Sequence, residues 1–267
     1  MNFNKNIIAM IHVPALPGTP KNYMNMNQII DHCIEEAKLY KKCGVNTIML
    51  ENMHDVPYLN RCVGPEITAS MAIVASEVKK IFSGFIGIQV LAGANKEALA
   101  IAHCADLDFI RAEGFVFGHM ADEGMMNACA GELLRYRKQI GAEKVAILTD
   151  IKKKHSAHAI TSDVSIADTA HAVQFFLSDG VIVTGVATGD APDLEELKQV
   201  KQAVTLPVLL GSGITPDNIE TYYNYADGFI IGSYFKHNGY WENELDEERI
   251  CKMVNYLKTK NNENNKN

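Results

Sequence analysis

Short apolar runs alternate along this chain with longer segments in which apolar residues recur at helical spacing. This alternation is typical of parallel strand–helix units, in which each strand is buried on both faces and each helix on one. Eight runs predict strands, at Ile7–His12, Val45–Glu51, Phe85–Leu91, Leu107–Ala112, Lys144–Asp150, Gly180–Thr184, Val208–Gly211 and Gly228–Gly232.

An amphipathic segment follows each predicted strand and predicts a helix. These segments are Asn27–Cys43, Glu66–Phe82, Asn95–Cys104, Asn127–Ile140, Ser165–Ser178, Leu194–Ala203, Pro216–Tyr223 and Glu247–Lys260. Pro192 with Asp193, and Thr215 with Pro216, combine a capping side chain with a proline near a first helical turn. Residues 261–267 form a polar tail of low complexity, which is expected to be disordered.

Eight strand–helix units fit either a closed barrel or an open, doubly wound sheet. An open dinucleotide-binding sheet places Gly-x-Gly-x-x-Gly after its first strand, whereas His12 is followed here by Val-Pro-Ala-Leu-Pro-Gly. The glycine-containing loops instead follow the last strands. We therefore expect a (β/α)8 TIM barrel of the phosphate-binding type, as one domain over residues 1–260.

Composition narrows this picture mainly by exclusion. Hydrophobic residues make up 47% of the chain and charged residues 21%, as in ordinary globular proteins. The net charge of −7 argues against a nucleic-acid partner, since the only dense basic run is Lys152-Lys153-Lys154. No apolar run is long enough to span a bilayer, and the first strand leaves no room for a cleavable presequence, so a cytoplasmic protein is expected. Six scattered cysteines without a C-x-x-C pair indicate neither a zinc site nor a disulfide framework.

The last strands end in loops suited to a phosphate. Strand seven ends in Leu210-Gly-Ser-Gly-Ile214 and strand eight in Ile231-Gly-Ser233, where phosphate-binding barrels hold the anion between neighbouring loops. Glycine lets the backbone approach the anion more closely than a Cβ would allow. Any one glycine also fits a simple strand end, but their joint placement after three successive strands favours a phosphorylated ligand. The predicted phosphate-binding residues are Gly185, Gly211, Ser212, Gly213, Gly232 and Ser233, with Thr188-Gly189 as a further turn.

Polar and charged residues end the other predicted strands, and a barrel would bring these ends to one mouth. Carboxylates next to Arg or Lys often have shifted pKa values and act as acid or base. We predict Asp150 as the base, Glu51 as its partner, and Lys152 or Arg111 as the group that stabilises developing negative charge. Taken singly, each residue fits a rim salt bridge equally well. The predicted substrate-binding residues are His12, Asn52, Gln89, Glu113 and Thr184.

Two further segments carry open alternatives. The loop after Asp150 is longer than the roughly two to six residues of a usual βα connection, and such loops often form lids. His155 and His158 in this loop have metal-ligand chemistry but no third ligand at a fixed spacing, so no metal ligand is assigned and a divalent metal stays open. Tyr240 and Trp241 either pack over the barrel end or form an interface, and a homo-oligomer is predicted on that basis.

Eight segments of the chain resemble the BtpA/SgcQ family. They are His12–Gly18, Glu51–Pro57, Phe109–Gly114, Ala121–Gly124, Leu134–Arg137, Asp150–His155, Asp179–Gly185 and Leu210–Ile214. The resemblance implies a phosphate-binding barrel. Cyanobacterial members are associated with photosystem I, whereas SgcQ-like members look like enzymes of unknown substrate. The chain is more similar to the SgcQ side, because Leu91-Ala-Gly-Ala-Asn95 replaces the Arg-Asn-Asp run of the cyanobacterial pattern.

These observations lead to one expected function and one rival. We expect an enzyme that acts on a phosphorylated sugar or nucleoside-like compound by acid–base proton transfer, as an isomerase or epimerase, with no identified cofactor. The rival is a noncatalytic assembly factor that binds a protein or a membrane surface. A charged mouth favours the enzyme, and an apolar, uncharged mouth favours the rival.

Overall fold

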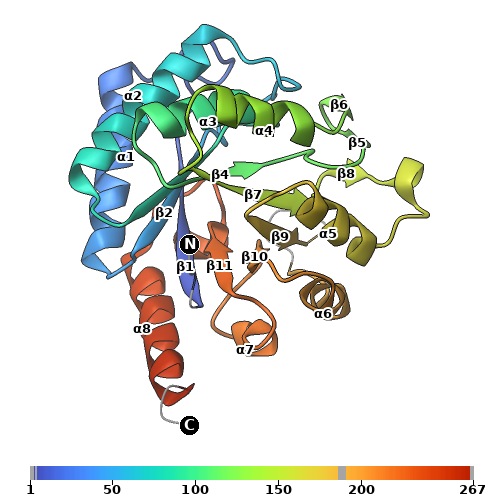
Figure 1. The fold of residues 1–267 in the computed structure, drawn as a ribbon. Helices are drawn as coiled ribbons and strands as arrows, with labels where there is room; N and C mark the ends of the chain where they lie inside the picture. The colour runs from blue at the N-terminus through green and yellow to red at the C-terminus, as the bar shows by residue number, and fades with distance from the viewer. Residues whose placement is uncertain (1–2, 4, 186–190, 265–267) are drawn as a thin grey trace.

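The computed structural model describes residue 3, residues 5–185 and residues 191–264. Within these residues, eight parallel strands close into a barrel in the order β1-β11-β10-β9-β7-β4-β3-β2, and helices surround it (Figure 1). The predicted (β/α)8 barrel is thereby confirmed, with strand ends shifted by a residue or two. The barrel strands are β1 (Asn6–His12), β2 (Thr47–Glu51), β3 (Phe85–Gln89), β4 (Phe109–Ala112), β7 (Ala146–Ile151), β9 (Gly180–Thr184), β10 (Val208–Gly211) and β11 (Gly228–Ile231).

The helices begin where the sequence offers capping side chains. Asn25, Ser165 and Asp193 each accept a hydrogen bond from a first-turn amide, as predicted for Asp193. The seventh helix starts three residues after Pro216, at Ile219, because the Asn218 side chain bonds back to the preceding loop. The helices are α1 (Met26–Lys42), α2 (Pro65–Ile81), α3 (Asn95–Cys104), α4 (Ala130–Gln139), α5 (Ile166–Phe175), α6 (Leu194–Ala203), α7 (Ile219–Tyr222) and α8 (Glu247–Asn264).

The C-terminal helix corrects one prediction. Residues 261–264 are helical, although the sequence predicts a disordered tail from residue 261, because extending a helix that has already formed costs far less than nucleating a new one. Among the described residues, no helix combines the length and the apolarity that crossing a membrane requires.

Apolar side chains fill the barrel inside and out. Successive strand residues point to opposite faces, so one set packs against the helices and the other fills the lumen. The Phe109 ring crosses the lumen beside Gly87, where a Cβ would lie 2.1 Å from the ring. A ligand can therefore enter only above this filled layer. The lumen residues are Phe3, Ile8, Met10, Met49, Phe109, Leu148, Ile182, Leu209 and Ile230.

A second, antiparallel sheet joins two loops on the C-terminal side of the barrel strands. β5 (His119–Ala121) and β6 (Gly124–Met126) form a hairpin after β4, and β5 also pairs with β8 (Ser156–Ala157) in the long loop after β7. The sequence does not predict these strands, because two or three residues carry too little alternation to recognise. Three short 3-10 helices lie in the connecting loops. η1 (Ala159–Thr161) follows β8, and η2 (Ser233–Phe235) and η3 (His237–Gly239) follow β11.

A buried ion pair fixes the segment after the last strand. Lys236 contacts Glu36 of α1, and their side chains are 3% and 5% exposed. Burial acts to raise the pKa of Glu36, but the hydrogen bond from His32 and the charge of Lys236 outweigh it and hold the pKa below its usual value. Glu36 is therefore ionised, and the pair ties η2 to the first helix.

Removal of either partner should destabilise the fold strongly. Glu36→Leu and Lys236→Met should each lower the free energy of unfolding by about 3–5 kcal/mol, because each leaves an unpaired buried charge. The double variant should recover most of this loss. Urea unfolding of all four proteins measures the coupling, and losses that simply add would contradict an energetically linked pair.

Candidate active site

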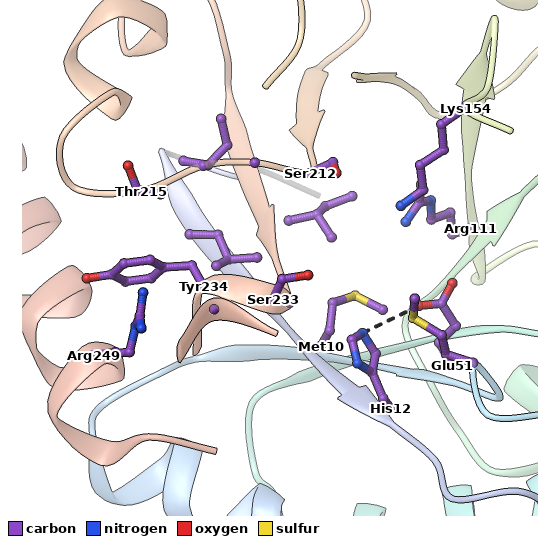
Figure 2. Close-up of a pocket in the computed structure, with 17 residues that line it drawn as sticks. Met10, His12, Glu51, Arg111, Lys154, Ser212, Thr215, Ser233, Tyr234 and Arg249 are labelled. Carbon is purple, nitrogen blue, oxygen red and sulfur yellow. Dashed lines mark ion pairs between the residues drawn. The ribbon is translucent and has the colours of Figure 1, made fainter. Parts of the chain in front are cut away.

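Two adjoining cavities occupy the mouth of the barrel. The first has a volume of about 140 Å³ and lies beside the ends of β10 and β11 (Figure 2). The second has a volume of about 310 Å³ and lies beside the ends of β3 and β4. Glu51, Met53, Arg111 and Lys154 line both cavities and so stand at their junction. We call the first the glycine lobe, after Gly213 and Gly232, and the second the acidic lobe, after Glu113, Asp122 and Glu123.

The glycine lobe brings together four of the predicted phosphate-binding residues. Ser212 and Gly213 line it from the loop after β10, and Gly232 and Ser233 line it from the loop after β11. Ser212 and Gly213 have φ angles of 76° and 64°, in the left-handed region. A Cβ at Gly232 would lie 3.1 Å from Nε2 of His12. The two turns therefore present closely packed backbone to the cavity.

The remaining predicted residues of this group lie behind the lobe. A Cβ on Gly211 would face Thr184 and Ile182 rather than the cavity. Thr184 is buried with its hydroxyl unpaired among the described residues, and neither it nor Gly185 lines the lobe. Thr188 and Gly189 lie outside the described residues.

A cation that sequence reasoning missed lies at the far side of the glycine lobe. Arg249, from α8, stacks over the Tyr234 ring with its guanidinium carbon 4.7 Å from the ring centroid. Its buried Nε has no hydrogen-bond partner among the described residues. Figure 2 shows it across the cavity from Arg111 and Lys154. The sequence carries no signal for it, because Arg249 is an ordinary helical residue until α8 packs beside the mouth.

Arg111 and Asp150 form a two-pronged ion pair. Nε of Arg111 donates to Oδ2 of Asp150 at 2.9 Å, and Nη2 donates to Oδ1 at 3.0 Å. Both side chains are more than nine-tenths buried. Asp150 thus uses both oxygens to hold the guanidinium and lines neither lobe. This geometry fits a positioning role for Asp150 better than the predicted role as base.

Glu51 and His12 face each other at the junction. Burial raises the pKa of Glu51, and the charges of Arg111 and Lys154 offset this only in part. Burial also lowers the pKa of His12 to about 3, so its ring is neutral. Nδ1 of His12 must carry the ring proton, because it pairs at 3.3 Å with the Trp241 carbonyl, which can only accept. The bare Nε2 therefore faces Oε2 of Glu51 at 3.9 Å, the contact dashed in Figure 2.

The structure corrects the choice of lysine at the mouth. Nζ of Lys152 donates to the Val164 carbonyl at 2.6 Å, which directs this side chain away from both lobes. Lys154 instead lines both lobes, and burial followed by the charge of Arg111 lowers its pKa. Three consecutive lysines give no sequence signal for which one points inward. The backbone decides, since Lys152 adopts a left-handed φ of 42° that turns the chain.

The acidic lobe gathers polar residues from four segments. Gln89 and Glu113, both predicted, line it together with Asp122 and Glu123 of the β5–β6 hairpin. Lys153 lies between the carboxylates, with Nζ 3.4 Å from Oε1 of Glu113 and 4.0 Å from Oε2 of Glu123. Burial raises the pKa of Glu113, although Lys153 opposes this. Glu123 and Lys153 lie in two of the segments that carry the family resemblance, but the sequence assigns neither a role, because the unpredicted small sheet brings them together.

Asn52 has a structural position instead of the predicted substrate contact. Its amide donates to Asp55 at 2.8 Å, and its oxygen accepts from the Leu91 amide at 2.7 Å. It lines neither lobe and joins the loops after β2 and β3. Trp241 does reach the acidic lobe, with its ring 5.0 Å from that of His54. Its side chain therefore packs over the barrel end, which is one of the two alternatives that the sequence leaves open.

Metal-ligand chemistry gathers away from the lobes. Among the described residues, Cys43, Glu247 and Cys251 form one group with ligand atoms within 4.8 Å of one another, and His32, Glu36 and Glu244 form another. The sequence missed the first group because its two cysteines are 208 residues apart. His158 packs against the ring of His119 and belongs to neither group. No cofactor is assigned.

Comparison with known proteins agrees with this architecture. A mitochondrial, functionally uncharacterized protein of Caenorhabditis elegans is 51% identical over 258 residues, which cover 95% of this chain and 93% of that protein. Photosystem I biogenesis protein BtpA of Synechocystis is 32% identical, over 93% of this chain and 86% of that protein. (S)-3-O-geranylgeranylglyceryl phosphate synthase of Thermoplasma acidophilum, solved with sn-glycerol-1-phosphate, has a TM-score of 0.60 at 16% identity, over 96% and 94% of the two chains.

The structural neighbour shows the fold alone, because its sequence identity is low. The sequence relatives show more, since their similarity covers nearly the whole chain. The profile of the BtpA family matches residues 3–259. The chain therefore belongs to the BtpA family.

Proposed function

We propose that this protein is an enzyme that binds a phosphorylated sugar or nucleoside-like compound at the mouth and moves a proton on it, as an isomerase or epimerase. One observation carries the proposal. Glu51, Arg111 and Lys154 line the same cavity as the Ser212-Gly213 and Gly232-Ser233 turns. A ligand anchored by its phosphate at the turns would place its neighbouring carbons beside these charged groups.

The glycine lobe supports a phosphate position on two grounds. Its turns combine two glycines with the Ser212 and Ser233 hydroxyls, so a tetrahedral anion can approach the backbone and accept hydrogen bonds. Arg249 adds a cation whose buried Nε has no hydrogen-bond partner in the part of the chain that the structure describes. The likeness to a barrel solved with sn-glycerol-1-phosphate is consistent with this placement.

The junction supplies the groups for proton transfer beside a carbonyl. Glu51 is the best-placed acid–base group, because burial raises its pKa toward the pH range in which a carboxylate can both take and return a proton. Arg111, held by Asp150, and Lys154 would stabilise the negative charge that develops on the substrate oxygen. His12 offers an acceptor at Nε2 to a substrate hydroxyl.

A noncatalytic assembly role remains the second candidate. Phe117, Met120, Met125 and Ile160 expose apolar side chains at or near the small sheet, and a relative is named for photosystem I biogenesis. The buried charges of the mouth favour the enzyme instead.

A native mass spectrum of the purified protein, with a search for retained phosphate or sugar phosphate, separates the enzyme from the assembly factor. It also tests the predicted homo-oligomer, and cell fractionation tests the predicted cytoplasmic location.

Gly213→Val should weaken phosphate binding by about tenfold or more, because its Cβ would occupy the space that the anion needs, a loss of about 1.4 kcal/mol. Gly141→Val is the matched control, since Gly141 has a similar φ of 69° and nothing within 4 Å of its Cβ position. Calorimetric titration with inorganic phosphate makes the measurement. Equal affinity of both variants for phosphate would contradict the placement of the anion.

Glu51→Gln should abolish proton transfer while ligand binding is kept. A thermal-shift screen of phosphorylated sugars and nucleotides first finds the ligand, since saturation at about 100 times Kd stabilises the fold by about 2.7 kcal/mol. Solvent deuterium incorporation into that ligand, followed by NMR, should then fall by about 10² to 10⁴. Glu132→Gln, at an exposed site on α4, is the control. Incorporation within about threefold of wild type would exclude Glu51.

His12 should stay neutral, with its proton on Nδ1, from pH 8 to below pH 5. Its folded pKa of about 3 lies below the ordinary 6.5, so the unfolded state binds more protons between these values. His12 therefore lowers the free energy of unfolding by about 1.4 kcal/mol for each pH unit below about 6.5. Long-range ¹⁵N NMR of the imidazole reports both the charge of the His12 ring and the nitrogen that carries its proton. A ring that titrates near pH 6.5 would contradict the predicted neutral state.

A further inference from the structure

The acidic lobe contains buried acceptors that have no hydrogen-bond partner among the described residues. These are Oε2 of Glu113 and Oε2 of Glu123, although their side chains are only 8% and 9% exposed. Within the same described residues, the buried amide oxygen of Gln89 also accepts no hydrogen bond. Burying an acceptor without a hydrogen bond destabilises the protein. All three residues line one cavity of about 310 Å³, so a ligand that donates hydrogen bonds there would remove this cost.

The charges around these acceptors restrict the chemistry of that ligand. Lys153 already lies within 4.0 Å of both carboxylates, so a second cation would meet its positive charge. A second anion would meet Glu113, Asp122 and Glu123. A hydroxyl group is neutral, donates to a carboxylate and accepts from an ammonium, and therefore matches both kinds of neighbour.

The walls of the lobe suit a compact polyhydroxyl group. Trp241 and Tyr58 contribute aromatic surface to the lobe, and Leu91 and Ala92 contribute apolar surface. Such mixed walls accept the C–H faces of a sugar while the carboxylates take its hydroxyls. The acidic lobe also shares Glu51, Arg111 and Lys154 with the glycine lobe, so one ligand can occupy both.

The β5–β6 hairpin is held in place to contribute to this wall. Nδ2 of Asn60 donates to the backbone oxygens of Glu123 and Met125 at 3.2 and 2.9 Å. Antiparallel pairing with β8 ties the same hairpin to the loop that carries Lys153. Glu123 and Lys153 are thus positioned together, although they come from different βα loops.

We propose that the acidic lobe is a second subsite, which binds vicinal hydroxyl groups of a sugar through Glu113, Glu123 and Gln89. This inference rests on the proposed function, which it narrows from phosphorylated compounds in general to sugar monophosphates. The phosphate lies in the glycine lobe, the reacting carbons lie at the junction, and the distal hydroxyls lie in the acidic lobe. A nucleotide base or a second phosphate fits the acidic lobe less well than sugar hydroxyl groups do.

Calorimetric titration of the full chain tests the subsite. The probes are inorganic phosphate, erythrose 4-phosphate, ribose 5-phosphate, fructose 6-phosphate, glucose 6-phosphate, and unphosphorylated ribose and glucose. At least one sugar phosphate should bind tenfold or more tightly than inorganic phosphate. Glu123→Ala should remove at least tenfold of that affinity and change the affinity for inorganic phosphate less than twofold. Glu132→Ala, at an exposed site, should change neither.

Gln89→Leu provides a second variant at another orphaned acceptor and should show the same selective loss. Inorganic phosphate binding with no sugar phosphate tighter than phosphate would overturn the subsite and leave the phosphate site standing. Binding of unphosphorylated sugar that depends on Glu123, without any phosphate binding, would support the subsite and overturn the phosphate site. No binding by any probe would overturn both. Sugar phosphate affinity that is equal in wild type, Glu123→Ala and Gln89→Leu would overturn the subsite alone.

Discussion

The site depends on the pairing that closes the sheet. β1 pairs in parallel with β11 on one side, from Asn6 with Gly228 to Ala9 with Ile231, and with β2 on the other. In a closed parallel barrel the carboxyl ends of all strands face one end, so residues far apart in sequence must share one mouth. His12, Glu51, Arg111 and Gly232 meet for this reason. The filled lumen beneath them closes the mouth from below.

Burial then decides the chemical character of each charged group at the mouth. Arg111 and Asp150 form a two-pronged contact, which holds the guanidinium of Arg111 in a fixed position. Glu51 and Glu113 have only partial compensation, and burial raises the pKa of each. Burial, followed by the charge of Lys236, lowers the pKa of His12 and keeps its ring neutral, and the Trp241 carbonyl fixes the ring proton on Nδ1. The same low-dielectric environment thus produces a fixed cation at Arg111, two carboxyl groups with raised pKa values at Glu51 and Glu113, and a neutral acceptor at His12.

In the proposed function, the two lobes divide ligand recognition between different parts of the chain. The glycine lobe is built from the loops after β10 and β11, with Arg249 from the last helix. The acidic lobe is built from strand ends on the opposite side and from the small sheet that joins two long loops. The reactive groups stand where the lobes meet. In this arrangement, changes in the hairpin can alter which ligand is selected while the acid–base groups stay on rigid strands.

The sequence by itself determined the barrel, its eight strands, the glycine turns after the last two strands and most of the charged residues at strand ends. These features follow from local patterns, namely apolar runs, helical spacing and glycine at strand termini, which act within a few residues. Only the tertiary structure decided that Asp150 engages Arg111, that Lys154 and not Lys152 faces the cavity, and that Arg249 and Glu123 belong to the mouth. These choices depend on loop backbone angles, on helix packing and on contacts between distant segments, and a linear pattern of residue types carries none of that information.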